Sequence, residues 1–390
     1  MSGLPVDLPG GSDLRAFRAE VRDWLAQNLP AELKVPYLRD PTGASGAELE
    51  KRLRWQSILH AGGWAAVHWP AEYGGRDVGM LEHAVFLAEC AAARAPEPAN
   101  VIGLSMVGPT LIEHGTVGQL ALLPPILSGE QMWCQLYSEP EAGSDLGMIR
   151  THGTRVAGGW SVSGQKVWCS WAAVADRGML LARTAAGRLD GLTCFLIDMH
   201  APGVRVRPMR QISGDEHFCE VFLDEVQVLE DQVVGAPGAG WAVATTTLTH
   251  ERTTAIFARH GATVDAAELL LTLLGRGSVA DVLCDRAAKL WTDAQLLRLS
   301  AYRGLSELGT GDLPAALYLQ RLAWGVANKA IFDLAADITS EPSVRDEVSA
   351  GELAAWQKLF LASQGWTIGG GTSEIQRNML ASRVLRMARA

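Results

Sequence analysis

Two serines and a tryptophan in short extended runs have side chains that could recognise a flat heterocycle. Ser138 lies just before a Glu-Pro pair, which forces a non-helical exit, and Ser170 follows Trp168 by two residues in a second run. Hydroxyl groups on rigid strands can hydrogen-bond the heteroatoms at the edge of a ring, and a tryptophan can pack against its face. The same pattern also fits two turn-capping serines and a core tryptophan, so both interpretations stay open at this point.

A segment of small residues near the C-terminus predicts the start of a helix. Thr372 and Ser373 follow a run of glycines and are both suitable N-cap residues. The N-terminus of a helix also favours a phosphate group. No Gly-x-Gly-x-x-Gly motif follows a strand-like run, so the sequence does not support nucleotide binding of the Rossmann type.

A carboxylate directly precedes an arginine at Glu251-Arg252. Taken alone, such a dipeptide is typical of a solvated helix face. A glutamate in an enclosed, poorly solvated site can instead act as a general base, with its pKa tuned toward ~6–7.

Length and composition limit the class of protein. The 390 residues suggest two or three packed units, and 48% hydrophobic with 20% charged residues is typical of a soluble globular protein. A net charge of −9 argues against nucleic acid as a partner. We find no signal pattern, bilayer-length apolar run or metal-ligand spacing, and the six scattered cysteines do not predict disulfides. We therefore expect a cytoplasmic protein.

The elements that must position these residues change in type along the chain. Helical spacing of apolar residues fills the first third, notably over 48–60, 80–94 and 108–114. From about Trp133 to Gly235 the chain has short runs punctuated by glycine and aspartate, and these predict strands over 160–163, 204–207 and 219–223. Helical spacing then returns to the end of the chain.

Two apolar stripes in the last part predict the core of a helical bundle. The first consists of Ala287, Leu290, Trp291, Ala294, Leu297 and Ala301. The second consists of Leu319, Leu322, Ala323, Val326 and Ala330.

Three segments, in this order and at this spacing, resemble the flavin-binding segments of the acyl-CoA dehydrogenase family. They are Trp133 to Asp145 (WCQLYSEPEAGSD), Gln165 to Ser170 (QKVWCS) and Gly369 to Arg377 (GGGTSEIQR). The resemblance implies an α+β fold with an N-terminal α-helical domain over 1–131, a middle β-barrel-like domain over 132–236 and a C-terminal four-helix-bundle domain over 237–390. It also implies FAD as the cofactor.

The resemblance assigns roles to individual residues. Leu136 and Ser138 would bind the pyrimidine edge of the flavin, Ser170 would donate to its reactive nitrogen, and Trp168 would pack on the ring. Thr372 and Glu374 would contact the ribityl and pyrophosphate portion, and Ser144 would lie near the coenzyme A portion of the substrate. His217 matches no such role, and we expect it to be a half-exposed loop histidine.

The resemblance also bears on the base. Many members of the family carry the catalytic glutamate at the position of Gly370, and glycine has no side chain to act as a base. A second arrangement, seen in isovaleryl and long-chain types, places the glutamate before an arginine on a C-terminal-domain helix. Glu251-Arg252 matches that arrangement, so Glu251 is the predicted base and Arg252 holds its geometry. Gly370 would leave room for a branched or bulky acyl group.

The implied reaction is the α,β-dehydrogenation of an acyl-CoA to a trans-2-enoyl thioester, with hydride transfer to flavin N5. Electrons would pass to an electron-transferring flavoprotein, in fatty acid or steroid side-chain β-oxidation. The family's Arg-x-x-Phe-Gly and Gln-x-Phe-Gly-Gly segments, which reach the neighbouring subunit's flavin, are missing. The chain is therefore expected in a homo-oligomer or in a hetero-oligomer with a related subunit. Two alternatives remain, namely a non-catalytic partner subunit and a flavin oxidase or hydroxylase on the same fold.

Overall fold

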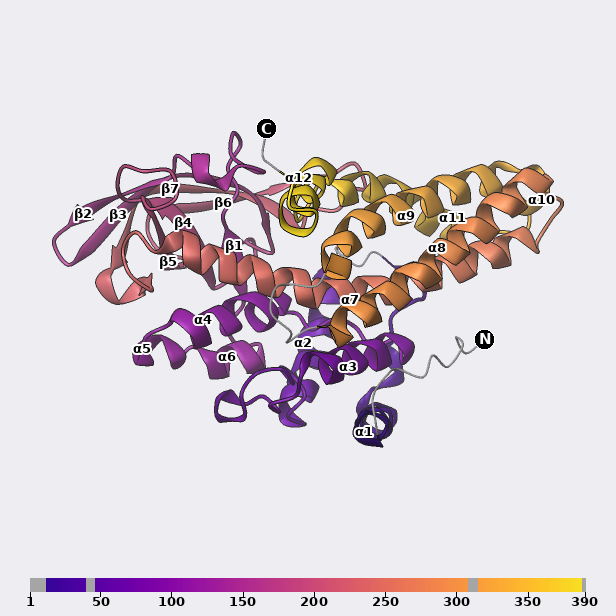
Figure 1. Cartoon of the computed structure of the whole chain (residues 1–390), viewed down its shortest axis with the longest axis horizontal. Coiled ribbons are helices and arrows are strands. Elements are labelled where there is room, and N and C mark those ends of the chain that lie inside the picture. Colours follow the sequence, from indigo (N-terminus) through magenta and orange to yellow (C-terminus); the bar gives the residue numbers. More distant parts are fainter. Residues whose placement is uncertain (1–11, 40–45, 308–314, 388–390) are drawn as a thin grey trace. The chain divides into compact units, whose positions relative to one another are not determined.

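The computed structural model describes residues 12–39, 46–307 and 315–387, without the side chains of 12, 46, 47, 252–260, 305, 306 and 317. The chain divides into two compact units. The sheet unit comprises 43–77 and 97–254, and the bundle unit comprises 1–42, 78–96 and 255–390. The long helix α7, Gly240–Leu274, begins in the sheet unit and continues into the bundle unit (Figure 1).

Within its described residues, the sheet unit holds one eight-stranded sheet in the order β6-β7-β3-β2-β4-β5-β8, with β1 paired parallel to β4 (Figure 1). The strands are β1 Trp133–Leu136, β2 His152–Val156, β3 Gly159–Ser170, β4 Arg177–Arg183, β5 Leu192–Asp198, β6 Val204–Met209, β7 Phe218–Leu229 and β8 Val233–Val234. Strands β4 and β5 are almost continuously buried because both faces are covered, whereas the edge strand β6 alternates in exposure. The predicted strands over 160–163, 204–207 and 219–223 are confirmed within β3, β6 and β7.

Short helices accompany this sheet. They are α2 Gly46–Ala61, α4 Gly108–His114, α5 Val117–Leu120 and α6 Leu123–Ser128. Their apolar side chains share one core with β1 and the start of α7, and this core includes Trp69, Leu111, Ile126 and Trp133. The helix predicted over 108–114 is confirmed as α4, and the one predicted over 48–60 lies within α2.

The bundle unit contains the remaining helices. They are α1 Ser12–Asn28, α3 Met80–Ala92, α8 Asp281–Ser306, α9 Ala315–Ser340, α10 Pro342–Arg345, α11 Ala350–Ser363 and α12 Ser373–Met379. The stripe predicted on α8 is confirmed as core, since Ala287, Ala294, Leu297 and Ala301 are all buried. The helix predicted over 80–94 corresponds to α3.

The stripe predicted on α9 is wrong. Leu319 is 46% exposed and Val326 is 52% exposed, so neither belongs to the core. The buried face of α9 instead carries Trp324 and Phe332, which pack with Trp366 in the core of the bundle. Because α9 is apolar on most sides, helical spacing could not identify the face that the large aromatic side chains bury.

Two other expectations bear on the whole chain. All six cysteines are free thiols in this structure. Among the described residues, no helix combines the length and the apolar character needed to cross a membrane.

Candidate active site

The predicted flavin segments of the sheet unit lie side by side. Leu136 is fully buried at the end of β1, and two residues later the carbonyl oxygen of Ser138 accepts a hydrogen bond from the N–H of Val167 at 2.9 Å. Val167 belongs to β3 and directly precedes Trp168. Ser138 and Val167 are 29 positions apart in the sequence, and this hydrogen bond joins them where the resemblance predicts a shared ligand.

Trp168 has an unusual backbone conformation that turns its ring outward. Its φ is +62°, and the pairing of β3 with β7 shifts register between Lys166 and Cys169. A bulky residue in the left-handed region costs about 1–3 kcal/mol, and such strain concentrates at functional sites. The side chain is 56% exposed, and its ring meets Phe218 edge-on at 5.8 Å. The alternative that Trp168 is a core residue is therefore wrong.

The two serines keep their hydroxyl groups available. Ser138 and Ser170 are both half-buried. Within the described part of the chain, neither hydroxyl has a hydrogen-bond partner. Two such hydroxyls beside an exposed, strained tryptophan match the edge and the face of a flat heterocycle, so these residues fit the isoalloxazine ring of FAD.

His217 lies next to this group, and it is buried rather than half-exposed as expected. The histidine is 8% exposed, and its ring centroid lies 4.3 Å from that of Phe218. Its carbonyl oxygen accepts from the N–H of Trp171, another tryptophan with positive φ (+64°). The segment that starts β7 thus supports the strained turn after Ser170. The residues that flank His217 in the sequence do not predict this packing, because the pairing of β3 with β7 produces the contacts.

A buried ion pair in the same region was also missed from the sequence. Lys166 is fully buried, and its Nζ lies 2.8 Å from Oε1 of Glu139 and 3.0 Å from the carbonyl oxygen of Tyr137. Burial lowers the pKa of Lys166, and the Glu139 carboxylate partly offsets this effect. Burial alone would raise the pKa of Glu139, but Lys166 and the N–H of Arg150 hold it below its ordinary value.

Glu251 is half-buried on α7, within the sheet unit. It lies one helical turn after Thr247, whose hydroxyl is 3.1 Å from the hydroxyl of Tyr137 and 3.0 Å from that of Thr110. Burial raises the pKa of Tyr137 well above its usual value, and the charge of Glu251 adds to this rise. The carboxylate is therefore within electrostatic range of the residue between Leu136 and Ser138. The side chain of Arg252 lies outside the described residues.

Ser144 is exposed in the loop that follows β1. The next residue, Asp145, accepts from the guanidinium of Arg188 at 2.7 Å, and both side chains are more than half exposed. Surface pairs of this kind contribute about 0–1 kcal/mol. Ser144 thus lies on an accessible part of the loop.

The C-terminal segment belongs to the bundle unit, and the other predicted site residues belong to the sheet unit. Thr372 is the N-cap of α12 and accepts from the N–H of Ile375 at 3.3 Å, which confirms the predicted helix start. Gly370 is exposed with a φ of +69°, a conformation that favours glycine. Glu374 is exposed, and its carboxylate accepts hydrogen bonds from its own backbone N–H and from the Thr372 hydroxyl, which lower its pKa.

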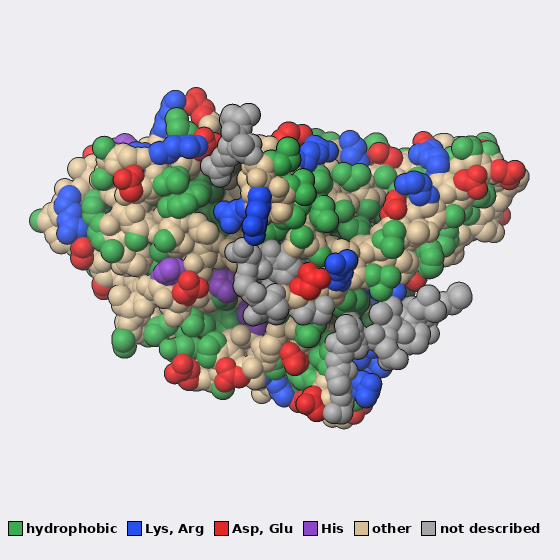
Figure 2. Space-filling model, viewed as in Figure 1, with side chains coloured by type: hydrophobic (Ala, Val, Ile, Leu, Met, Phe, Trp, Pro, Cys, Tyr) green, Lys and Arg blue, Asp and Glu red, His purple; other side chains and the backbone are tan. Residues whose placement is uncertain are grey.

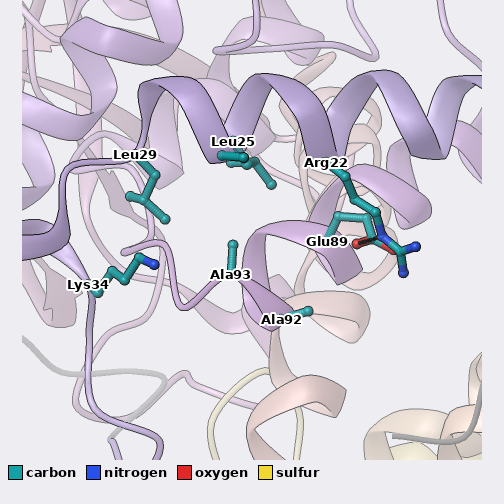
Figure 3. A pocket seen from close by; sticks show the side chains of 8 residues that line it. Arg22, Leu25, Leu29, Lys34, Glu89, Ala92 and Ala93 are labelled. Atoms are coloured by element: carbon teal, nitrogen blue, oxygen red, sulfur yellow. Dashed lines mark hydrogen bonds and ion pairs between the residues drawn. The ribbon is translucent and has the colours of Figure 1, made fainter. Parts of the chain in front are cut away.

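A cavity of about 370 Å³ lies elsewhere in the bundle unit (Figure 3). It is lined by Lys34, by residues of α1 and α3 and by the residue that directly follows each helix, and the Arg22–Glu89 ion pair of 2.7 Å borders it. None of the predicted site residues lines this cavity. On the face shown in Figure 2, basic and acidic side chains are interspersed.

Comparison with known proteins gives the same three-part pattern. The models for the N-terminal, middle and C-terminal domains of acyl-CoA dehydrogenase match residues 11–130, 134–226 and 238–385. The acyl-CoA dehydrogenase IpdE1 of Mycobacterium tuberculosis is 38% identical over 384 residues, which cover 97% of this chain and 98% of that protein.

Solved structures agree in fold. The Tcur3481-Tcur3483 steroid ACAD has a TM-score of 0.83 at 25% identity, and the match covers 98% of this chain and 100% of that one. The ChsE4-ChsE5 complex from Mycobacterium tuberculosis has a TM-score of 0.80 at 24% identity, covering 98% and 99% of the two chains. The chain described here belongs to the acyl-CoA dehydrogenase family of FAD-dependent oxidoreductases.

Proposed function

We propose that this chain converts an acyl-CoA thioester to the trans-2-enoyl thioester, with Glu251 as the base. The observation that carries the proposal is the position of Glu251 one helical turn after Thr247, whose hydroxyl lies 3.1 Å from that of Tyr137. Tyr137 lies between Leu136 and Ser138. The helix that carries the proposed base is thus joined, by one buried hydrogen bond of Thr247, to the segment proposed to bind the flavin.

The residues proposed to hold FAD are those that the family resemblance assigns to it. FAD, when bound, supplies the acceptor for the β-hydrogen that leaves as hydride. The half-buried hydroxyls of Ser138 and Ser170 and the exposed ring of Trp168 support binding of its ring system. The complete proposed set is Leu136, Ser138, Trp168, Ser170, Thr372 and Glu374.

Glu251 would take the α-proton of the substrate. Its half-buried position limits solvation of the carboxylate, and Arg252 is proposed to hold its geometry. Backbone N–H groups near Gly370 are proposed to polarise the thioester carbonyl, which makes the α-proton more acidic. Ser144 is exposed, as suits a residue near the solvent-facing coenzyme A portion.

The acyl group is proposed to be branched or bulky, as in a fatty acid or steroid side chain. Gly370 adds no side chain next to the reacting carbons, and its φ of +69° disfavours any larger residue there. The similar Tcur3481-Tcur3483 structure, at 25% identity, is described as a steroid enzyme, which supports this choice.

The chain is proposed to work in an oligomer and to pass electrons to an electron-transferring flavoprotein. One structure of the same fold, ChsE4-ChsE5, is a complex of two different proteins. Apolar side chains such as Leu319, Val326 and Ile368 are 46%, 52% and 61% exposed in the bundle unit, and a second subunit would cover surfaces of this kind. The six free thiols support a cytoplasmic location.

A second candidate is a non-catalytic subunit that completes a flavin site on a related chain. The two-protein composition of ChsE4-ChsE5 favours it. The half-buried Glu251 and the available serine hydroxyls favour a catalytic subunit instead.

An anaerobic absorption spectrum of the purified chain, alone and co-expressed with a related subunit, tests the proposal. We expect a flavin band that bleaches on addition of one class of acyl-CoA thioester, with branched and steroid-type thioesters compared against straight-chain ones. A flavin that no thioester bleaches would contradict the proposal. A colourless chain that gains flavin only with its partner, and keeps activity after Glu251→Gln, would support the second candidate.

A further inference from the structure

Lys166 and Glu139 form an ion pair in the interior of the sheet unit. Lys166 is 0% exposed and Glu139 is 7% exposed, and their side chains meet at 2.8 Å. Removing two charges from water is unfavourable, and a pair of packed apolar side chains of similar volume often gives equal or greater stability. The stability of the fold therefore does not explain why this position holds two charges.

All partners of the pair belong to the backbone around Ser138 or to the loop that follows it. The Lys166 ammonium binds the carbonyl oxygen of Tyr137 at 3.0 Å as well as Glu139. The Glu139 carboxylate also accepts from the N–H groups of Arg150 at 2.5 Å and Thr151 at 2.9 Å. The residues on both sides of Ser138 are thus fixed by charge-assisted hydrogen bonds, which are stronger than neutral ones.

The pair also joins two parts of the sheet that strand pairing leaves separate. Strand β1, which leads into Ser138, pairs with β4, whereas β3 pairs with β2 and β7. Lys166 lies on β3, and the next residue, Val167, donates to the carbonyl oxygen of Ser138 at 2.9 Å. Trp168 follows immediately with its positive φ. The ion pair therefore fixes the spacing between Ser138 and the strained turn of β3.

We propose that Lys166 and Glu139 are positioning residues that set Ser138 and Trp168 at the separation the flavin ring requires. Neither side chain needs to touch the cofactor, since Lys166 is fully buried and acts through the backbone of Tyr137 and through Glu139. This inference rests on the proposed function, because it assumes that Ser138 and Trp168 bind the flavin.

The test is the double variant Lys166→Met/Glu139→Gln, purified in the same oligomeric form as the wild type. Removing both charges avoids a buried unpaired ion and keeps the fold. We expect FAD affinity to fall at least about tenfold, because small displacements of positioned groups have large effects on ligand binding. We also expect a shifted flavin absorption band and amide exchange at Val167 that is about tenfold faster.

The matched control is Arg155→Met/Glu230→Gln, which removes a pair with side chains 58% and 53% exposed in the same unit. FAD affinity and Val167 exchange should stay at wild-type values in this control. A folded Lys166/Glu139 double variant with unchanged FAD affinity and unchanged Val167 exchange would overturn the inference. If the double variant does not fold, Lys166→Met alone decides, because Glu139 keeps its hydrogen bonds from the N–H groups of Arg150 and Thr151. Wild-type FAD affinity in that variant would overturn the inference.

The two proposals fail in different ways. A wild-type protein that binds no FAD, alone or with a partner subunit, contradicts the proposed function. A wild-type protein that binds FAD, with variants that bind it equally well, contradicts only the positioning role.

Discussion

The surroundings of Ser138 in the sheet unit and of Phe332 in the bundle unit are built from different kinds of side chain. Around Ser138, the sheet unit buries hydroxyls, a lysine and a glutamate, and it holds Trp168 in a strained conformation. The core of the bundle unit around Phe332 is formed by large apolar side chains, with tryptophan rings 5.6–5.8 Å from that of Phe332. The polar interior groups around Ser138 thus lie beside the residues proposed to bind the flavin, whereas the aromatic cluster around Phe332 serves packing.

The largest expected effect on stability is in the bundle. Phe332 is 2% exposed, and its replacement by alanine leaves a cavity, so Phe332→Ala should lower the free energy of unfolding by about 3–5 kcal/mol. Chemical denaturation measures this value. The exposed Thr292→Ala on α8 is the control and should change it by less than about 0.5 kcal/mol.

The same bundle variant separates packing from chemistry. Flavin absorption and the rate of flavin reduction in Phe332→Ala should match the wild type at temperatures where the variant is folded. A lower rate of flavin reduction in folded Phe332→Ala would contradict the view that the region around Phe332 serves packing alone.

The next effect concerns the buried hydroxyls of the sheet unit. Tyr137→Phe removes the bond to Thr247 and should lower the free energy of unfolding by about 0.5–1.5 kcal/mol. It should also slow flavin reduction, because Thr247 lies one helical turn before Glu251. Stopped-flow absorption measures the rate.

A matched tyrosine lies in the bundle unit. Tyr318 is 8% exposed, and its hydroxyl makes no hydrogen bond within the described residues. Tyr318→Phe should leave both stability and reduction rate unchanged. Equal effects of the two substitutions would show that the Tyr137–Thr247 bond has no special role.

The smallest effect is the pH dependence of stability. The pKa of Glu139 is lower in the folded protein than its ordinary value of 4.5, so the unfolded chain binds the proton more readily. The stability that Glu139 contributes is present above that value and is lost as the pH falls through the folded pKa. Urea midpoints at acid pH should therefore fall less steeply in Lys166→Met/Glu139→Gln than in the wild type. Identical pH profiles would show that the pKa of Glu139 does not differ between the folded and the unfolded protein.

The sequence predicted the order of elements and several of their positions. Helix α4 ends as predicted because Gly115 follows it, whereas at its start the helical backbone continues from the π-helix Gly103–Val107. The buried face of α9 was predicted wrongly because the helix carries apolar residues on most of its sides. Spacing identifies a helix more reliably than it identifies the face that a neighbouring aromatic cluster selects.

Site residues could be predicted from the sequence only where they belong to a segment that resembles the family. Lys166 lies in the quoted QKVWCS segment, but its burial depends on Glu139, which is 27 residues away. A lysine in a short polar run gives no local sign of an internal partner. The positive φ of Trp168 likewise arises from the register shift between β3 and β7, which only strand pairing reveals. The predicted domain boundaries and site residues stay proposals.

The measurement that tests the central claim most directly is anaerobic flavin reduction by an acyl-CoA substrate in Glu251→Gln. The control is Glu268→Gln, another half-buried glutamate on α7. We predict that Glu251→Gln keeps the flavin absorption band but loses about 10²–10⁴-fold in reduction rate, while the control reacts at the wild-type rate. A near-normal rate in Glu251→Gln would contradict the assignment of Glu251 as the base.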